Sequence, residues 1–411
     1  MADALTAGPG FVPERKAAAE RLGAMGLPGR RDEYWRWTDP ATLNAPDPKP
    51  AQAGEAEAPL FDALDRLKVV FVDGVFDAGA SDDLSLAGVE ITRLATSAPG
   101  WAEGLYGTLE ATGQVPVKRP FAALNTAQAT DGLLIRVTAA AAKPINLIYV
   151  HKSETSDPIL HHLIRLEEGA ELTLLETGPA GARFNKAMEV DLAKGARFHH
   201  IRIQGPDQER RAVTHIFARL ADAALFKSFT LTFNGVLTRN EAFVEMLGDD
   251  AMAHVAGAAL GDGRDGAFHH DDTVFVTHDG LRGESRQVFK KVLKGGAIGT
   301  FQGKILVKPG AQKTDGYQIS QSLLLDDDSQ FLAKPELEIY ADDVKCSHGS
   351  TTGAIDETAL FYLRSRGVPE EDAKGLLVLS FLADAIDEIE DAALKEEIVA
   401  RLEDWLARHR S

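Results

Sequence analysis

Three stretches of the chain decide the fold: "EEGAELTLLETG" (167–178), "AKGARFHHIRIQ" (193–204) and "LADAALFKSFTLTFNG" (220–235). In each, turn residues precede a run of alternating apolar and polar side chains. When Leu172, Phe198 and Leu225 are aligned, the apolar positions lie 26 and 27 residues apart. A repeat of this length is typical of a solenoid of stacked β coils, because one coil cannot bury its apolar face alone.

The same character extends from about residue 120 to residue 345, where short alternating runs are cut by Gly and Asp. A β-sandwich is the alternative, but its strands would recur every 8 to 12 residues or so without the longer period. After residue 250 the repeat becomes less regular. The pattern favours the solenoid and leaves the sandwich open.

The two ends of the chain have a different pattern. Residues 13–25 predict a helix that Pro13 opens and Gly26 ends. "NAPDPKPAQAGEAEAP" (44–59) is rich in Pro, Ala and Glu, which predicts a mobile linker. "LKVVFVDGVF" (67–76) and "VEITRL" (89–94) are expected to form strands, the first with a turn at its Asp-Gly pair.

Three helices are expected after Thr352. "DETALFYLRSRG" ends at Gly367, and the next helix begins near Pro369 with acids in its first turn. The last helix carries one apolar stripe, formed by Leu394, Ile398, Leu402, Trp405 and Leu406. The predicted organisation is an N-terminal helical and mixed domain (1–118), a β core (119–350) and a C-terminal helical domain (351–411).

Composition excludes several classes of protein. A net charge of −18 argues against a nucleic-acid partner, whose binding needs clustered Lys and Arg. No run approaches 18 apolar residues, and the first 20 residues lack the apolar region of a signal peptide. The single cysteine fits a reducing cytoplasm. "GDGRDG" (261–266) has no helix after it and two repelling Asp, so we expect a turn there and no nucleotide site.

Three histidine pairs occur at 161–162, 199–200 and 269–270. Neighbours on a strand face opposite sides, so one imidazole of each pair is free to point outward. Three such imidazoles on adjacent coils would suit a metal site. The simpler interpretation, which we favour, is that the pairs are polar positions on solvated sheet faces.

The only cysteine, Cys346, lies in "DDVKCSHGST" (342–351) with His348 two positions later. On a strand these two side chains share a face, and both are soft to borderline ligands that suit iron or sulfur species. An inert packed cysteine is the alternative. Two ligands are too few for a closed metal site. Asp342 and Asp343 would oppose deprotonation of the thiol, and Lys345 would favour it.

Several phrases resemble one known family, the SufB/SufD proteins, over a stretch from about residue 10 to the end. The phrases are "LPGRRDEYWRWTDP" (27–40), "RPFAALNTAQATDGLLIRV" (119–137), "KPINLIYV" (143–150) and "KPELEIYADDVKCSHGSTTGAIDETALFYLRSRGVPEEDAKGLLVLSFLADAI" (334–386). The resemblance implies a right-handed parallel β-helix core between N-terminal and C-terminal helical domains. It also implies a role in iron–sulfur cluster assembly, in a complex of SufB, SufD and two copies of the SufC ATPase.

Within that family the chain resembles SufD more than SufB. SufB carries Glu-His-Glu where this chain has residues 346–348, and it carries a cysteine in a preceding coil where this chain has "QISQSLL" (318–324) with Ser320 and Ser322. The resemblance therefore implies a non-catalytic scaffold subunit, with ATP hydrolysis belonging to SufC. A stand-alone β-helix carbohydrate enzyme would need an array of carboxylates that the sequence does not show.

The resemblance also implies two sites. Cys346 and His348 would supply part of an iron or nascent-cluster site that SufB completes, and the alternative is a purely structural partner of SufB. SufC would dock on "ETALFYLRSRGVPEEDAKG" (357–375), chiefly through Leu360, Phe361, Tyr362, Arg364, Arg366 and Gly367. We expect no cofactor bound by the chain alone, no membrane contact, and a homodimer when SufB is absent.

Overall fold

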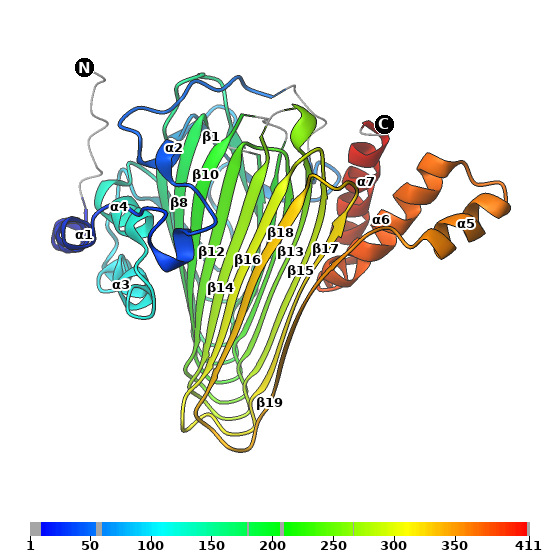
Figure 1. Ribbon diagram of the computed structural model, residues 1–411. Coiled ribbons are helices and arrows are strands. Elements are labelled where there is room, and N and C mark those ends of the chain that lie inside the picture. Colours follow the sequence, from blue (N-terminus) through cyan, green and yellow to red (C-terminus); the bar gives the residue numbers. More distant parts are fainter. Residues whose placement is uncertain (1–9, 55–59, 179–180, 206–208, 266, 409–411) are drawn as a thin grey trace.

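Parallel strands stacked into a β-solenoid form the centre of the molecule (Figure 1). The computed structural model describes residues 10–54, 60–178, 181–205, 209–265 and 267–408. Within these residues, sheet A has ten strands in the order β19-β17-β15-β13-β11-β9-β7-β5-β1-β2, and sheet B has nine in the order β18-β16-β14-β12-β10-β8-β6-β4-β3. From β4 onward consecutive strands alternate between the sheets, so each coil contributes one strand to each sheet.

The strands of the coils have these bounds. Sheet A contains β5 (Ile145–Val150), β7 (Glu171–Thr177), β9 (Arg197–Gln204), β11 (Leu225–Phe233), β13 (Met252–Asp262), β15 (Glu284–Lys294), β17 (Asp315–Leu324) and β19 (Lys345–Gly353). Sheet B contains β4 (Leu133–Val137), β6 (Ile159–Leu166), β8 (Arg183–Leu192), β10 (Arg211–Leu220), β12 (Leu237–Met246), β14 (His269–His278), β16 (Ile298–Val307) and β18 (Gln330–Ile339).

The remaining elements lie mostly at the two ends of the chain. The early strands are β1 (Leu67–Val72), β2 (Val75–Phe76) and β3 (Val89–Arg93). The early helices are α1 (Val12–Met25), η1 (Glu33–Trp35), α2 (Ala41–Asn44), η2 (Gly100–Ala102), α3 (Thr108–Gly113) and α4 (Pro120–Gln128). After the coils come α5 (Glu357–Ser365), α6 (Glu370–Ile386) and α7 (Ala392–Arg408), while η3 (Gly263–Asp265) is the expected turn after β13.

The solenoid prediction is confirmed, because the ladders between coils are parallel and a sandwich of hairpins would make them antiparallel. The predicted first helix, the early strands and the three C-terminal helices are also present. The right-handed sense of the winding stays a prediction. The sheets begin earlier than the expected core boundary at residue 119, since β1 pairs with β5 and β3 pairs with β4.

The alignment of the repeat was wrong by one residue in its third member. Leu172 pairs with Phe198 as expected, but Phe198 pairs with Phe226, and Leu225 pairs with Arg197. A shift of one residue moves a side chain to the other face of a sheet. Phe226 therefore continues the buried column inside the solenoid.

Coil length explains the irregular period after residue 250. Equivalent residues are 26 apart at Thr214 and Asn240 and 28 apart at His200 and Ser228. Later coils are longer, with 31 residues between Gln287 and Gln318. Part of the increase lies in the strands themselves, since β15 has 11 residues where β9 has 8, and the register between coils stays parallel.

The inside of the solenoid combines an apolar column with buried charges. Phe198 and Phe226 stack at a ring-centroid distance of 5.8 Å. Between β7 and β8, the carboxylate of Glu176 accepts a hydrogen bond of 2.6 Å from the ammonium of Lys186, and both side chains are fully buried. Burial lowers the pKa of Lys186 to about 8, against the attraction of Glu176. Breaking one half of such a pair would leave an uncompensated charge inside the protein.

Buried imidazoles line the same interior. Burial lowers the pKa of His162 to about 3 and the pKa of His200 and His278 to about 4. In the unfolded chain the ordinary imidazole pKa is about 6.5. Below pH 6.5 these imidazoles are therefore protonated in the unfolded state and neutral in the folded state. The free energy of unfolding decreases as the pH falls.

We expect the free energy of unfolding to decrease when the pH is lowered from 6.5 to 5, as measured by denaturant titration. His278→Asn should reduce the slope by up to about 1.4 kcal/mol per pH unit, because one depressed imidazole is removed. Ser285→Ala is the control, since it deletes the hydroxyl that contacts His278 at 2.8 Å and keeps the titrating group. An unchanged slope in His278→Asn would contradict the assignment.

The N-terminal segment covers the outer face of sheet B. Tyr106 and Leu109 pack with Phe217 and Phe243, which point outward from β10 and β12. Part of the expected mobile linker also lies on the solenoid. Ala51 is 1% exposed and donates a backbone hydrogen bond of 2.8 Å to Glu154. Residues 44–54 are thus held against the coils, and residues 55–59 lie outside the described residues.

Candidate functional site

The last coil is the open end of the solenoid. In the described part of the chain, β18 pairs only with β16, and β19 pairs only with β17, so both strands present a free edge. Their residues are mostly exposed or half-buried, unlike those of the preceding coils. Free edges offer unpaired backbone groups to another chain.

Cys346 and His348 both lie on β19, on the face that continues the interior of the solenoid. Cys346 pairs in register with Gly316, and His348 pairs with Gln318, whose side chain is fully buried. Gly316 makes room for the thiol, because a Cβ at this position would lie 3.2 Å from the Cys346 sulfur. The thiol is half-buried, and the imidazole is exposed.

The surroundings of Cys346 favour the neutral thiol. Burial raises its pKa, and the negative charge of Asp315 raises it further, while a backbone hydrogen bond from Gly316 opposes them. From their position in the sequence, Asp342 and Asp343 were expected to be the acids that oppose deprotonation. The structure instead pairs Asp343 with Lys313 and brings Asp315 from the preceding coil, a neighbour that only the stacking reveals.

The metal-binding capacity of this site is incomplete within one chain. Among the residues that the structure describes, no group of three or more His, Cys, Asp or Glu side chains is placed to hold a metal ion. Cys346 also packs beside the apolar cluster of Ile305, Val307, Ala311 and Ala341. The pair therefore offers two ligand atoms at an open edge and no closed cage.

We expect Cys346 to alkylate with iodoacetamide more slowly at pH 8 than a free thiol, because thiolate is the reactive form. Asp315→Asn should raise the rate roughly two- to fivefold by removing the repelling charge. Asp343→Asn, whose carboxylate is engaged by Lys313, is the matched control. Mass spectrometry reads one site only, since the chain has one cysteine. Equal rates in all three proteins would refute the role of Asp315.

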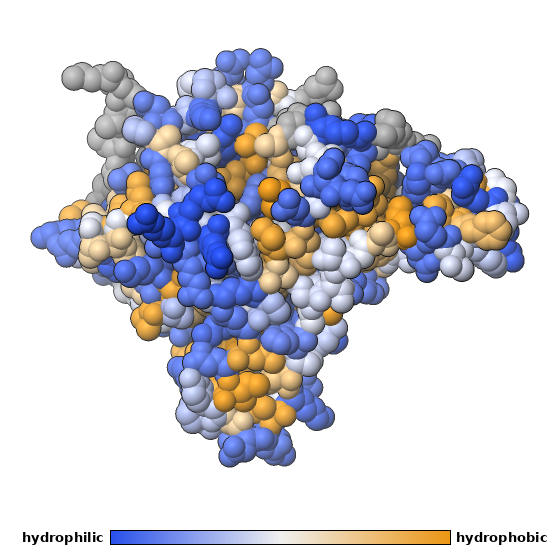
Figure 2. Space-filling model, in the orientation of Figure 1, coloured by the Kyte–Doolittle hydropathy of each residue, from blue (hydrophilic) through white to orange (hydrophobic). Residues whose placement is uncertain are grey.

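The second predicted site, on α5, is largely exposed. Leu360 faces inward and is 6% exposed, whereas Phe361 is 73% and Tyr362 is 52% exposed. Figure 1 shows α5 projecting from the solenoid together with the start of α6, and Figure 2 shows hydrophobic surface on this projection. Two aromatic side chains of α5 are therefore left largely uncovered by the described chain.

Cations flank the exposed rings at the end of α5. The guanidinium of Arg366 lies 4.3 Å from the ring centroid of Tyr362, and Arg364 forms an ion pair of 3.3 Å with Glu370. Gly367 ends the helix with a φ of 87°, a left-handed conformation that favours glycine. The arrangement gives an apolar centre with arginines at its rim, as in protein interfaces.

The histidine pairs are not on solvated faces, so the interpretation that we favoured is wrong. His161 is fully buried and contacts Glu189 at 2.8 Å, while His162 contacts Tyr149 at 3.0 Å. His270 is likewise buried and lies 2.9 Å from the ammonium of Lys291. These three imidazoles contact polar groups of other elements, which the sequence pattern could not show. His199 is half-buried and lines a hollow on the outer face of sheet A.

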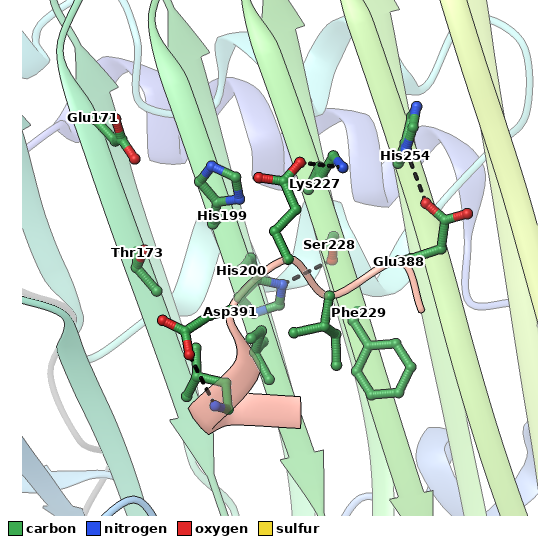
Figure 3. Close-up of a pocket in the computed structure, with 14 residues that line it drawn as sticks. Glu171, Thr173, His199, His200, Lys227, Ser228, Phe229, His254, Glu388 and Asp391 are labelled. Atoms are coloured by element: carbon green, nitrogen blue, oxygen red, sulfur yellow. Dashed lines mark hydrogen bonds and ion pairs between the residues drawn. The ribbon is translucent and has the colours of Figure 1, made fainter. Parts of the chain in front are cut away.

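The C-terminal helices are attached to sheet A by a row of ion pairs around a small hollow (Figure 3). His254 contacts Glu388 at 2.9 Å, and Lys227 contacts Glu390 at 2.6 Å. Lys290 contacts Asp384 at 2.7 Å. The bases come from successive strands, and the acids come from the end of α6 and the loop after it. Beneath them, Leu382, Ile398 and Trp405 join the apolar outer face of sheet A.

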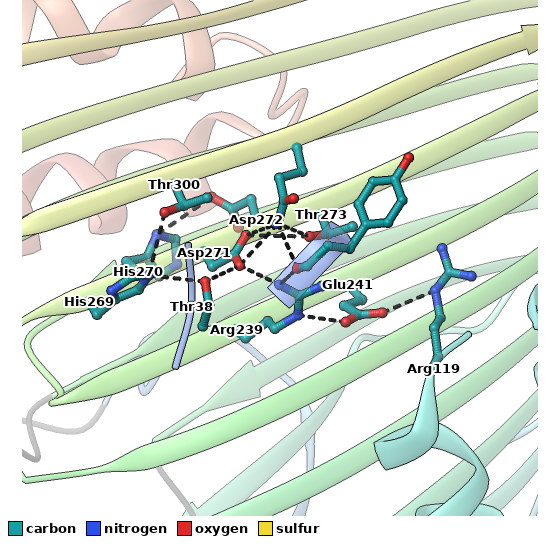
Figure 4. Close-up of polar contacts among 12 residues, drawn as sticks. Thr38, Arg119, Arg239, Glu241, His269, His270, Asp271, Asp272, Thr273 and Thr300 are labelled. Atoms are coloured by element: carbon teal, nitrogen blue, oxygen red, sulfur yellow. Dashed lines mark hydrogen bonds and ion pairs between the residues drawn. The ribbon is translucent and has the colours of Figure 1, made fainter. Parts of the chain in front are cut away.

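A second polar network anchors the N-terminal segment on sheet B (Figure 4). Arg239 donates to Glu241 at 2.6 Å and also binds Asp271, which accepts a hydrogen bond from Thr38. Arg119 completes the network through an ion pair of 3.0 Å with Glu241. All four charged side chains are buried, so the network holds the early segment to β12 and β14.

The N-terminal segment also reaches the open end of the solenoid. The hydroxyl of Tyr34 donates a hydrogen bond of 2.8 Å to Glu336 on β18. The ammonium of Lys334 lies 4.2 Å from the ring centroid of Tyr34. The first segment of the chain is therefore fixed to its last coil.

The helices of the described residues include none that is both long enough and apolar enough to cross a membrane.

Comparison with known proteins agrees with this architecture. Residues 113–381 match the family model described as "SUF system FeS cluster assembly, SufBD core domain". The chain is 28% identical to the iron-sulfur cluster assembly protein SufD of Escherichia coli, over 95% of this chain and 92% of the relative. It is 26% identical to the Bacillus subtilis protein of the same name, over 79% and 75%. It is also 26% identical to the chloroplastic protein ABCI7 of Arabidopsis thaliana, over 93% and 83%.

The fold and the exposed surfaces together define a β-solenoid protein with an open last coil and projecting C-terminal helices. The chain belongs to the SufBD family of the SUF system, as the resemblance predicted. Relatives across its length are named as iron–sulfur cluster assembly proteins, which supports a role in that process for this chain.

Proposed function

We propose that this chain is a non-catalytic scaffold subunit of iron–sulfur cluster assembly, and that it pairs with SufB through its open last coil. The observation that carries the proposal is the position of Cys346 and His348. They lie on a free edge strand, on the face that continues the polar interior. A partner strand beside β19 would bring its own ligands to the same place. The iron or nascent cluster is the cargo of this site, held transiently and jointly by the two chains.

The alternative is that Cys346 only packs and that SufB carries all of the chemistry. The raised pKa of the thiol and its contact with apolar neighbours support this alternative. The exposed imidazole and the polar strand around it support a ligand role. Substitution within the assembled complex separates the two, because packing and ligation have different readouts.

We expect His348→Ala and Cys346→Ala each to lower the cluster yield of the complex with SufB and SufC by more than half. Iron content and the visible absorbance of the cluster measure the yield, and light scattering shows that the complex stays assembled. Ser347→Ala is the matched control, since its side chain points to the opposite face of β19. An undiminished yield in both variants would support the purely structural alternative.

We further propose that the exposed face of α5 docks SufC, the subunit to which ATP hydrolysis belongs. Phe361 is the natural anchor, because it is the most exposed aromatic side chain on this helix. Leu360 supports the helix from below, and Arg364, Arg366 and Gly367 shape its end. Buried aromatic anchors surrounded by arginines dominate the energy of many interfaces.

We expect Phe361→Ala and Tyr362→Ala each to weaken SufC binding by about 1 to 3 kcal/mol, as measured by calorimetry. The melting temperature of the chain alone should not change, since both rings are exposed. Val75→Ala, at another exposed apolar position, is the control. Unaltered affinity in folded variants would place the docking site elsewhere.

The chain made without SufB is expected to form a homodimer. Its two free edges are available to a second copy when the natural partner is absent, and a two-fold axis would use the same surface on both. Light scattering at micromolar concentration should give twice the mass of one chain. A monomeric mass would contradict the predicted homodimer.

A location in the cytoplasm is consistent with the single cysteine and with the role of the family in iron–sulfur cluster assembly.

A further inference from the structure

A large groove lies between the C-terminal helices and the last turns of the solenoid, and it begins where the stretch 357–375 ends. Its volume is about 930 Å³. Its apolar floor is formed by Leu325, Ile355, Leu376, Leu379 and Leu406. Leu376 is 51% exposed, and the other four are the half-buried margin of the apolar cluster under α6 and α7. Helices α6 and α7, together with the loops at Arg264, Gly295, Leu325 and Ile355, thus frame an apolar channel that is open to solvent.

The rim of the groove is acidic. It carries Asp326, Asp328, Glu371, Asp372, Glu403 and Asp404. The basic side chains that line it are already engaged by carboxylates. Arg264 and Lys294 bind Asp262 at 2.8 and 3.1 Å, and Lys374 binds Glu370 and Glu371 at 3.0 Å each. By contrast Asp328, Glu403 and Asp404 form no ion pair with any residue that the structure describes.

We propose that this groove binds a basic amphipathic helix of a partner protein, with apolar side chains on its floor and lysines or arginines at its rim. An apolar floor between two helices is the usual seat of an amphipathic helix. The unpaired carboxylates along the margin select a positively charged partner and repel a second copy of this acidic chain. Glu371, Asp372, Lys374 and Gly375 line the groove and also end the stretch 357–375 on which SufC is proposed to dock. The proposed SufC anchors Phe361 and Tyr362 lie outside the groove, so substitutions on α5 distinguish this inference from the proposed function.

The probe is a fluorescein-labelled 18-residue peptide of leucine and lysine at helical spacing, titrated with the full-length chain at 0.15 M salt. A peptide of the same composition, with its order scrambled to abolish the apolar face, tests for simple charge attraction. Fluorescence anisotropy should show at least tenfold tighter binding of the amphipathic peptide.

Two groove variants on separate helices keep the test independent of folding. Glu403→Lys on α7 and Leu376→Ser on α6 should each weaken binding at least fivefold. Glu168→Lys is the charge-matched control at an exposed turn, and Phe361→Ala probes the α5 surface. Both controls should bind within twofold of the unmodified chain.

Three outcomes would overturn the proposal. Equal binding of the scrambled peptide, or equal weakening by Glu168→Lys, would reduce the effect to attraction by the net charge of −18. Weakening by Phe361→Ala would move the site to α5. A change in particle mass caused by Glu403→Lys alone would show that a second copy occupies the groove.

Discussion

The parallel register between successive coils is the constraint on which this structure depends. Each residue stacks on one equivalent residue in the coil before it and on one in the coil after it, so side chains form continuous columns. Phe198 and Phe226 lie in one column, and the column two residues further along the same strands contains polar side chains. The buried pair of Glu176 and Lys186 lies across the interior of one coil, between β7 and β8, and each charge is tolerated there because it is paired with the other.

The same columns explain why the candidate site lies at the end of the solenoid. Gln287 and Gln318 hydrogen-bond inside consecutive coils, and His348 occupies the next position of their column. Within the described residues no further coil covers β19, so a column position that is buried in the other coils is exposed there. The edge that carries Cys346 and His348 is therefore a continuation of the solenoid interior. It is exposed because the stack of coils ends at β19.

Local patterns in the sequence were sufficient for the first helix, the early strands, the solenoid and the three C-terminal helices. They missed α4, which begins the stretch where only strands were expected. Alternation predicted the strands, and Pro13, Gly26 and Gly367 marked helix ends because their backbone preferences act locally. The register of Leu225 was mistaken because two adjacent apolar residues fit the repeat equally well, and only the turn length distinguishes them. Asp315 beside Cys346 was missed because stacking joins residues about one coil apart.

Burial was the least predictable property for similar reasons. The histidine pairs look polar in sequence, but their partners come from distant elements, such as Thr38 for His269, 231 residues away. Ala51 lies in a segment whose composition is typical of a linker, yet one small side chain and a few backbone bonds suffice to dock it. The amino-acid composition of a segment describes its average polarity. It does not predict a contact made by one residue.

The contact of Tyr34 with Glu336 joins positions 302 residues apart. During synthesis the segment around Tyr34 leaves the ribosome long before β18 exists, so this contact has to wait for every coil between them. Such a closing contact has a very high contact order, which makes it a late event in folding. Glu33 and Tyr34 therefore engage β18 only on a finished solenoid, whereas Trp35 already finds its packing partners Phe121 and Val213 when the early coils have formed.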